Sequence, residues 1–144
     1  MKKSIIMLFC LFLIACNSSG IIIAETPEEA LQKLDSKEDD FKINKILNST
    51  NDNQKQGYYV FEGEVDNRIE WFVANVVTND LSWYVKDFVN IGTPNNENET
   101  YSSGTDTFTA GLSNKPEDKK NDRIIVDIPE NDYYVWIEKL ENKK

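Results

Sequence analysis

The sequence predicts a mainly β fold (α+β at the margin). We expect an antiparallel meander of about six to seven strands, forming a small sandwich or a partly closed barrel, with one short N-terminal helix. Two observations predict this fold. From residue 41 onward, apolar side chains recur at every second position, the period of a strand with one buried face. Pairs of turn-forming residues separate these runs, as in β-hairpins.

The helix is expected to begin at the stretch Thr-Pro-Glu-Glu, residues 26–29. Threonine can cap the first turn, proline fits the first helical position, and a glutamate three residues after the threonine completes a capping box. Ala30, Leu31 and Leu34 then form one apolar stripe, and the helix should end near residues 35–37. We expect this stripe to cover one end of a sheet.

Four strands are expected in the first half of the domain, at residues 41–47, 58–65, 68–77 and 81–89. Polar residues 48–57 should form a loop, and Asp66-Asn67 and Asn79-Asp80 are turn signals. The central strands are apolar on both faces, so each side of the sheet should be covered. Trp71 and Trp83 should therefore both be largely buried. In the fourth strand, one face should carry Leu81, Trp83, Val85 and Val89.

Three further strands are expected at residues 108–112, 123–128 and 133–140. The polar stretches 90–105 and 113–122 should be long loops, and Pro129 to Asp132 should form a turn between the last two strands.

Aromatic residues occur as adjacent pairs: Tyr58-Tyr59, Trp71-Phe72, Trp83-Tyr84 and Tyr133-Tyr134. Neighbours in a strand point to opposite faces, so one member of each pair faces away from the main core. These side chains either form a second core layer under the helix and long loops, or an exposed surface that binds a glycan or a protein. The first interpretation is favoured because aromatic residues are good strand formers. The candidate binding surface consists of Tyr58, Tyr84 and Tyr134.

The N-terminus has the organisation of a signal peptide. Lys2 and Lys3 form a short positive region, and an uncharged apolar run of 11 residues follows, from Ile5 to Ala15. As a helix this run would measure about 16 Å, roughly half the hydrocarbon core of a bilayer. It is too short to be a transmembrane helix.

The apolar run ends in Leu13-Ile14-Ala15-Cys16, which resembles the lipobox of bacterial membrane lipoprotein precursors. Leu13 and Ala15 match that pattern, whereas Ile14 stands where a small residue is more common. The resemblance implies that the Cys16 sulfur receives a diacylglyceryl group, with acyl chains such as palmitate, and that cleavage makes Cys16 the mature N-terminus. Cys10 would leave with the signal peptide.

These observations divide the chain into a lipoprotein signal peptide (1–15), a lipidated cysteine and tether (16–25), and a single mostly-β domain (26–144). Within the tether, Ile21 to Ile23 either form a first strand or lie at the lipid headgroup boundary; their β-branched side chains favour the strand. The alternative is an ordinary secretory signal cut after Ala24, which would discard Cys16 and release a soluble secreted protein.

The folded part is similar to small lipoproteins of low-GC Gram-positive bacteria. The resemblance rests on the Thr-Pro-Glu-Glu-Ala helix start, the two-sided meander and the Trp-Tyr-Val-Lys strand, together with a bias towards Lys, Asn and Ile. It implies a location on the extracytoplasmic face of the cell membrane, held by lipid, and implies no activity.

The composition narrows the chemistry. The chain has no histidine and two cysteines, of which acylation and cleavage would leave no free thiol. Histidine-based triads, thiol catalysis and imidazole metal sites are therefore excluded, and we expect no cofactor and no metal. Loss of Lys2 and Lys3 takes the formal charge from −9 to −11, so nucleic acid is not an expected partner.

We therefore expect a non-catalytic binding or accessory module of the cell envelope, attached to the membrane through the lipid on Cys16. Its partner would be an envelope protein, a peptide or a glycan. The alternative is a small envelope hydrolase that uses carboxylates, for which Glu62 and Glu64 share one strand face. A solvated strand face is the favoured interpretation of that pair.

Overall fold

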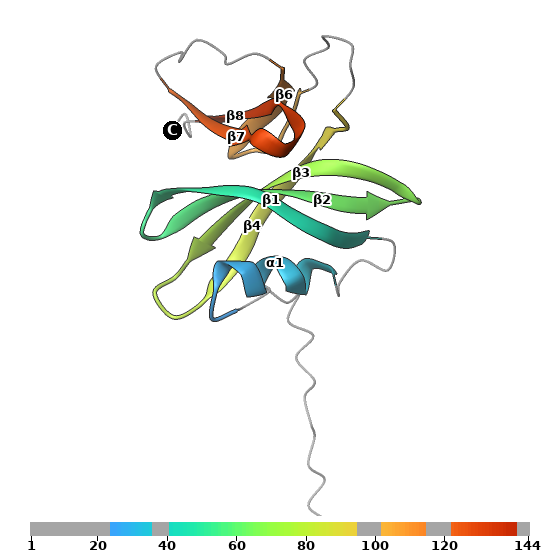
Figure 1. Cartoon of the computed structure of the whole chain (residues 1–144). Helices are drawn as coiled ribbons and strands as arrows, with labels where there is room; N and C mark the ends of the chain where they lie inside the picture. Colours follow the sequence, from blue (N-terminus) through green and yellow to red (C-terminus); the bar gives the residue numbers. More distant parts are fainter. Residues whose placement is uncertain (1–23, 36–40, 95–101, 115–121, 141–144) are drawn as a thin grey trace, which may run out of the picture.

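The protein is arranged in three layers, a helix and two four-stranded antiparallel sheets (Figure 1). The computed structural model describes residues 24–35, 41–94, 102–114 and 122–140. The first sheet has the order β1-β2-β3-β4 and the second the order β5-β6-β8-β7. The elements are α1 (Pro27–Asp35), β1 (Phe41–Asn53), β2 (Gln56–Val65), β3 (Arg68–Thr78), β4 (Trp83–Gly92), β5 (Ser102–Gly104), β6 (Phe108–Ser113), β7 (Arg123–Ile128), the 3-10 helix η1 (Pro129–Asn131) and β8 (Tyr133–Lys139).

The mainly β class is confirmed, and of the two expected architectures the structure is a sandwich. The described ranges contain eight strands, against the six to seven expected. The additional strand is β5, which lies inside the stretch 90–105 that was expected to be a loop. At three residues, Ser102–Gly104 is too short to give a recognisable alternation.

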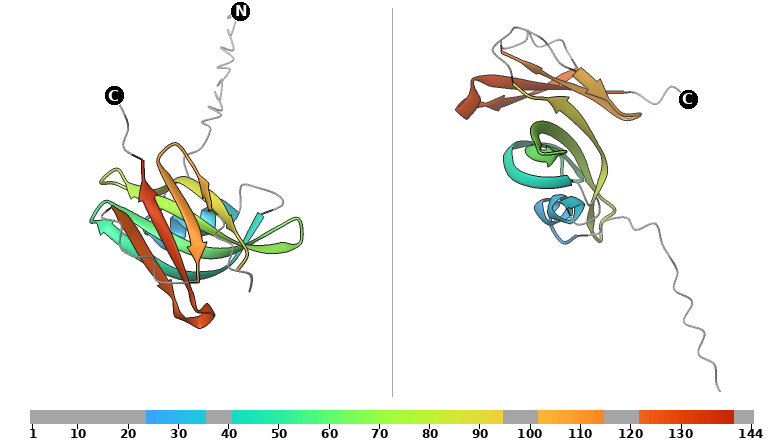
Figure 2. Two further views of the ribbon diagram at one scale, coloured as in Figure 1. Left: turned by 90° about the horizontal axis from the view of Figure 1, so that it is seen from above. Right: turned by 90° about the vertical axis from the view of Figure 1, so that its right-hand side faces the viewer.

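Helix α1 begins with the expected capping interactions. The Thr26 hydroxyl accepts a hydrogen bond from the Glu29 backbone N–H at 3.1 Å, and the Glu29 carboxylate accepts one from the Glu25 N–H at 2.8 Å. The stripe of Ala30, Leu31 and Leu34 is buried. The helix lies across a face of the first sheet and contacts β1, β3 and β4, so the expectation that it covers a sheet end is wrong (Figure 2).

Strand β1 runs on to Asn53, so the loop expected at residues 48–57 is wrong. Only residues 54 and 55 connect β1 to β2, because Asn53 already pairs with Gln56. Register shifts at residues 44, 47 and 52 break the alternation of side chains along this edge strand. Most of its polar side chains face solvent. In the sequence, the second half of the strand is therefore a run of polar residues like that of a loop.

The β2–β3 hairpin has the expected two-residue turn. Asp66 and Asn67 both have left-handed backbone conformations, with φ of 51° and 60°, and Val65 pairs with Arg68. Positive φ at both central residues is the geometry of a type I′ turn, which matches the twist of the flanking strands.

The first sheet is buried on both faces, and each face has its own core. The inter-sheet core lies between the two sheets and includes Tyr58, Val60, Trp71 and Val73. The helix-covered core lies between the first sheet and α1. It includes Tyr59, Phe61, Phe72, Ala74 and Val76. The pairs Tyr58-Tyr59 and Trp71-Phe72 thus each send one ring to each core, which confirms the interpretation of a second core layer under the helix for these pairs.

Strand β4 differs from its predicted alternation. Val85 packs on the helix-covered core, whereas Val89 belongs to the inter-sheet core, so they do not share a face. A register shift causes the change: Val76 pairs with Val85 and Asn75 with Asp87, which leaves Lys86 unpaired as a bulge. Trp83 is partly buried and packs against the margin of the helix-covered core, and so is less enclosed than Trp71, which is 2% exposed.

Candidate functional site

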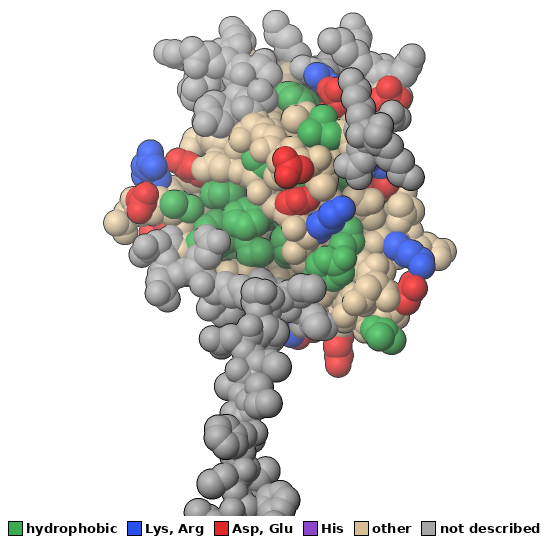
Figure 3. Space-filling model, turned by 180° about the vertical axis from the view of Figure 1, so that it is seen from behind, with side chains coloured by type: hydrophobic (Ala, Val, Ile, Leu, Met, Phe, Trp, Pro, Cys, Tyr) green, Lys and Arg blue, Asp and Glu red, His purple; other side chains and the backbone are tan. Residues whose placement is uncertain are grey.

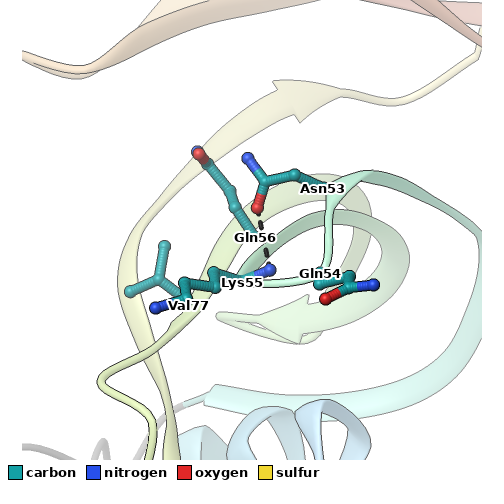
Figure 4. A pocket seen from close by; sticks show the side chains of 5 residues that line it. All are labelled: Asn53, Gln54, Lys55, Gln56 and Val77. Atoms are coloured by element: carbon teal, nitrogen blue, oxygen red, sulfur yellow. Dashed lines mark hydrogen bonds between the residues drawn. The ribbon is translucent and has the colours of Figure 1, made fainter.

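A shallow, open hollow of about 480 Å³ lies on the surface beside the β1–β2 turn (Figure 4). Its lining consists of Asn53, Gln54, Lys55, Gln56 and Val77. Three of these side chains are amides, each of which both donates and accepts hydrogen bonds. Asn53 and Gln56 point to the same side of the turn (Figure 4).

The turn is held by its own side chains and by the neighbouring hairpin. The Asn53 side-chain oxygen accepts a hydrogen bond from the Lys55 N–H at 2.8 Å. The Lys55 carbonyl accepts one from the Thr78 N–H at 3.0 Å, and the Lys55 ammonium pairs with Asp80 at 2.6 Å. The lining is therefore attached to the β3–β4 hairpin.

Hydrogen bonds to two buried residues hold one lining side chain of the hollow in place. Asn75 is 1% exposed and is the one polar residue in the buried set of the described ranges. Gln56 donates from its side-chain nitrogen to the Asn75 Oδ1 at 2.9 Å and to the Tyr58 hydroxyl oxygen at 3.2 Å. Because a buried amide without partners is costly, this network fixes the position of Gln56 in the lining.

The phenol of Tyr58 stays neutral over a wide pH range. Burial raises the pKa of Tyr58 to about 12, and the negative charges of Asp52 and Asp87 contribute. The ammonium of Lys139 pairs with Asp52, and the Thr107 hydroxyl donates to Asp87. The lining of the hollow itself carries three neutral amides and one lysine that is paired with Asp80. These groups suit the amide and hydroxyl groups of a ligand.

Two of the three candidate tyrosines lie next to lining residues of this hollow, although neither lines it. Tyr58 is 1% exposed, so its assignment to an exposed surface is wrong: its ring belongs to the inter-sheet core, where it packs edge-on against Phe108. Tyr84 is partly buried and stands opposite Val77 in the β3–β4 ladder, on the same face of the sheet. Cys16 lies outside the described residues.

Tyr134 lies elsewhere, partly buried on the outer face of the second sheet. On that face the Arg123 guanidinium carbon stands 4.2 Å from the centre of the Trp136 ring, and the Arg123 Nε donates to Glu138 at 3.0 Å. Trp136 is 7% exposed and its indole N–H has no hydrogen-bond partner. The predicted three-tyrosine surface is thus divided between two sides of the molecule.

The residues that build the hollow were not singled out from the sequence. Asn75 did carry a signal, because it interrupts the apolar stretch Trp71–Val77 at a position that faces the inter-sheet core. The amides of the β1–β2 turn carried none, since that stretch was expected to be a loop.

No family model, no curated protein and no solved structure matches this chain.

The carboxylates Glu62 and Glu64 do share one face of β2, as expected. Each stands opposite a lysine of β1, Glu62 opposite Lys45 and Glu64 opposite Lys42. Neither glutamate lines the hollow at the turn or the second hollow, of about 280 Å³, between α1 and β1. Lys45 forms its ion pair with Glu130, so the two glutamates lie on a charged strand face opposite lysines, which fits the solvated strand face that the sequence favoured.

In the described part of the chain, no group of three or more His, Cys, Asp or Glu side chains is arranged to hold a metal ion. Among the same residues, no helix has the length and apolarity needed to cross a membrane. The face seen in Figure 3 carries separate patches of hydrophobic side chains among acidic and basic ones.

Proposed function

We propose that the protein is a membrane-anchored extracytoplasmic lipoprotein, acylated at Cys16, that acts as a non-catalytic binding module of the cell envelope. The amide-lined hollow at the β1–β2 turn is its binding site. The ligand is a polar chain that carries amide groups, such as a peptide or an N-acetylated glycan. The observation that carries the binding role is the network in which buried Asn75 and Tyr58 hold Gln56 in the lining of the hollow.

The position of Ala24 supports the lipobox over the rival cleavage. Ala24 is 3% exposed and exchanges two backbone hydrogen bonds of 2.7 Å with Trp83. Cleavage after Ala24 would remove this residue and leave the Trp83 N–H and carbonyl without these partners. Cleavage before Cys16 keeps Ala24 in the mature protein.

The chemistry of the hollow supports an amide-bearing ligand. A side-chain amide can pair with another amide through one donated and one accepted hydrogen bond. The Gln56 amide nitrogen already donates to Asn75 and Tyr58, so Gln56 contributes its side-chain oxygen to such a pairing. The Asn53 oxygen already accepts from Lys55, so Asn53 contributes its side-chain nitrogen. Val77 provides apolar contact. Because Lys55 is already paired with Asp80, the site does not depend on an anionic ligand.

Fatty-acid labelling tests the anchor. The wild type and Cys10→Ala should incorporate labelled acid equally, whereas Cys16→Ala should incorporate none and should leave the detergent-rich phase. Cys10→Ala is the matched control because it changes a cysteine inside the apolar run. Equal labelling of the wild type and Cys16→Ala, or a mature N-terminus at Glu25, would contradict the lipobox assignment.

Titration of the purified lipoprotein tests the hollow. The probes are N-acetylglucosamine oligomers in one series and short alanine-rich peptides in the other, followed through the NMR signals of side-chain amides. Gln56→Ala should weaken binding about tenfold, the loss of roughly one hydrogen bond to a buried polar group. Gln32→Ala, an exposed glutamine lining the other hollow, should leave binding unchanged. If Gln32→Ala weakened binding and Gln56→Ala did not, the site would be misplaced.

A further inference from the structure

An apolar side chain projects from the tip of the β3–β4 turn. Leu81 is 93% exposed, the highest value among the large hydrophobic residues in the described ranges. Its neighbours in the turn, Asn79, Asp80 and Ser82, are polar, so the leucine is an isolated apolar point. A single exposed leucine is common on protein surfaces, and its meaning depends on what holds it and where it lies.

The turn that carries Leu81 is held by a set of hydrogen bonds. The Asn79 side-chain oxygen accepts from the Leu81 N–H at 3.2 Å and from the Ser82 N–H at 3.1 Å. The Thr78 hydroxyl donates to the Ser82 carbonyl at 3.0 Å. Asp80 has a φ of 75° and is paired with Lys55. These contacts hold the backbone of Leu81 at the tip of the turn.

The same turn lies where the N-terminal chain joins the domain. Ala24 is bridged to Trp83, two residues after Leu81. Cys16 precedes Ala24 by eight residues, a span of at most about 26–29 Å when fully extended. The β3–β4 turn lies at the α1 end of the molecule, opposite the second sheet (Figure 1).

We propose that Leu81 inserts into the headgroup boundary of the membrane that holds the acylated Cys16. The inference rests on the proposed lipid anchor. A single leucine among polar neighbours is too small to form the core of a protein interface, whereas a tethered domain needs only a small apolar point to fix its orientation at a bilayer. The pairing of Asp80 with Lys55 reduces the repulsion between this acidic domain and the headgroups.

Insertion gives the domain a defined orientation. Helix α1 and the β3–β4 turn face the bilayer, and the second sheet faces away from it. The hollow lies beside the inserted turn, because Lys55 in its lining is paired with Asp80 of that turn. Gln56 of the hollow is bonded to Asn75 and Tyr58 on the inter-sheet side of the first sheet, the side turned away from the bilayer.

A fluorescent label at position 81 tests the insertion. The lipidated chain is placed in phosphatidylcholine vesicles, and Leu81→Cys is labelled with an environment-sensitive fluorophore. The acylated mature chain has no other free thiol, because the Cys16 sulfur forms a thioether and Cys10 is removed. The control is Asn131→Cys, exposed in η1 of the second-sheet layer. The fluorophore at position 81 should shift to the blue and be quenched by spin-labelled lipid, and that at position 131 should not.

Hydrogen exchange of the unlabelled protein provides a second measurement. On vesicles, the backbone amides of residues 79–82 should exchange more slowly in the wild type than in Leu81→Ser. Suppose that the protein floats with the vesicles, but the label at position 81 is not quenched and residues 79–82 exchange equally in the wild type and Leu81→Ser. That result would overturn the insertion and leave the anchor intact. Failure to float, with no fatty acid on Cys16, would overturn both the anchor and the insertion.

Discussion

The two cores of the molecule are built differently, although they share the strands β2 and β3. In the helix-covered core, rings dominate: Phe41, Phe61, Phe72 and Phe88 contact one another at centroid distances of 5.2–6.3 Å. The inter-sheet core is mostly aliphatic, with Tyr58, Trp71 and Phe108 as its aromatic members. One core is closed by a short helix close in sequence to β1, and the other by strands far along the chain.

The difference shows where the fold can tolerate polar groups. The helix-covered core contains only hydrophobic residues in its buried set. The inter-sheet face of β3 carries Asn75, beside which Gln56 forms part of the hollow. The hollow that we propose as the binding site is thus attached to the inter-sheet core through Asn75, whereas α1 covers its own core with apolar side chains.

The largest expected effect is at Trp71, which is 2% exposed in the inter-sheet core. Trp71→Ala should lower the free energy of unfolding by about 3–5 kcal/mol, because it removes a buried ring and leaves a cavity. Trp83→Ala should cost less, roughly 1–2 kcal/mol, since its indole is only partly buried at the margin of the helix-covered core. Urea denaturation of both variants, with the wild type alongside, measures the difference.

If both substitutions lowered the free energy of unfolding by the same amount, Trp83 would be as well packed in the helix-covered core as Trp71 is in the inter-sheet core. The comparison of the two cores would then be wrong at this edge of the sheet.

The alternating pattern of the sequence was sufficient to predict the mainly β class, the two-sided strands and the capped helix, and it left a sandwich and a partly closed barrel as alternatives. It failed where a local shift changed the period. The bulge at Lys86 moves Val85 and Val89 to different cores, and three register shifts in β1 disguise a strand as a loop. A bulge adds one residue without a strong composition signal, so period counting does not detect it.

The candidate site was less predictable than the fold. Tyr58 and Tyr84 were selected as aromatic residues, yet the lining of the hollow is made of amides from a turn that was read as part of a loop. These amides come from the β1–β2 turn and share the lining with Val77 of β3. They meet only because the strands pair in the order β1-β2-β3-β4, which a local sequence pattern does not specify.

The next effect compares one tyrosine from each core at alkaline pH. Burial raises the pKa of Tyr58 and of Tyr59 to about 12, with nearby carboxylates contributing, chiefly Asp52 for Tyr58 and Glu28 for Tyr59. The folded state therefore keeps phenol protons that the unfolded chain releases above its ordinary pKa of about 10. Stability from this source is complete below pH 10 and is lost as the pH rises from 10 to about 12, by about 2–3 kcal/mol for each tyrosine.

Denaturation at a series of pH values tests this expectation, with tyrosinate absorbance as the direct readout. Tyr58→Phe and Tyr59→Phe should each flatten the alkaline loss by a similar amount, since both groups have the same direction of shift. If only one variant changed the profile, one of the two cores would admit water at its tyrosine.

A glycine tests the packing of the ring cluster. A Cβ at Gly63 would lie 2.8 Å from the Phe41 ring and 2.9 Å from the Phe72 ring. Gly63→Ala should therefore destabilise the protein by about 1–3 kcal/mol, the usual cost of overpacking a core. Gly57→Ala is the matched control in the same strand, because its closest neighbour, at 3.0 Å, is the movable end of the Asn51 side chain. Thermal unfolding of both variants measures the two effects, and Gly63→Ala should lower the melting temperature more than Gly57→Ala. The opposite order would show that the ring cluster is loosely packed around Gly63.

The smallest expected effect concerns the helix that closes the ring cluster. Thr26→Ala removes the hydroxyl that accepts from the Glu29 N–H, and loss of such a cap costs about 1 kcal/mol. Thr26→Ser keeps the acceptor and should restore most of that loss. The effect should be confined to the helix-covered core. In Thr26→Ala, the backbone amides of α1 should exchange faster than in the wild type, while the amides of β6 and β8 should exchange at the wild-type rates. Faster exchange in β6 and β8 as well would mean that the two cores unfold as one unit, because the loss of a single helix cap would then have loosened the core that α1 does not touch.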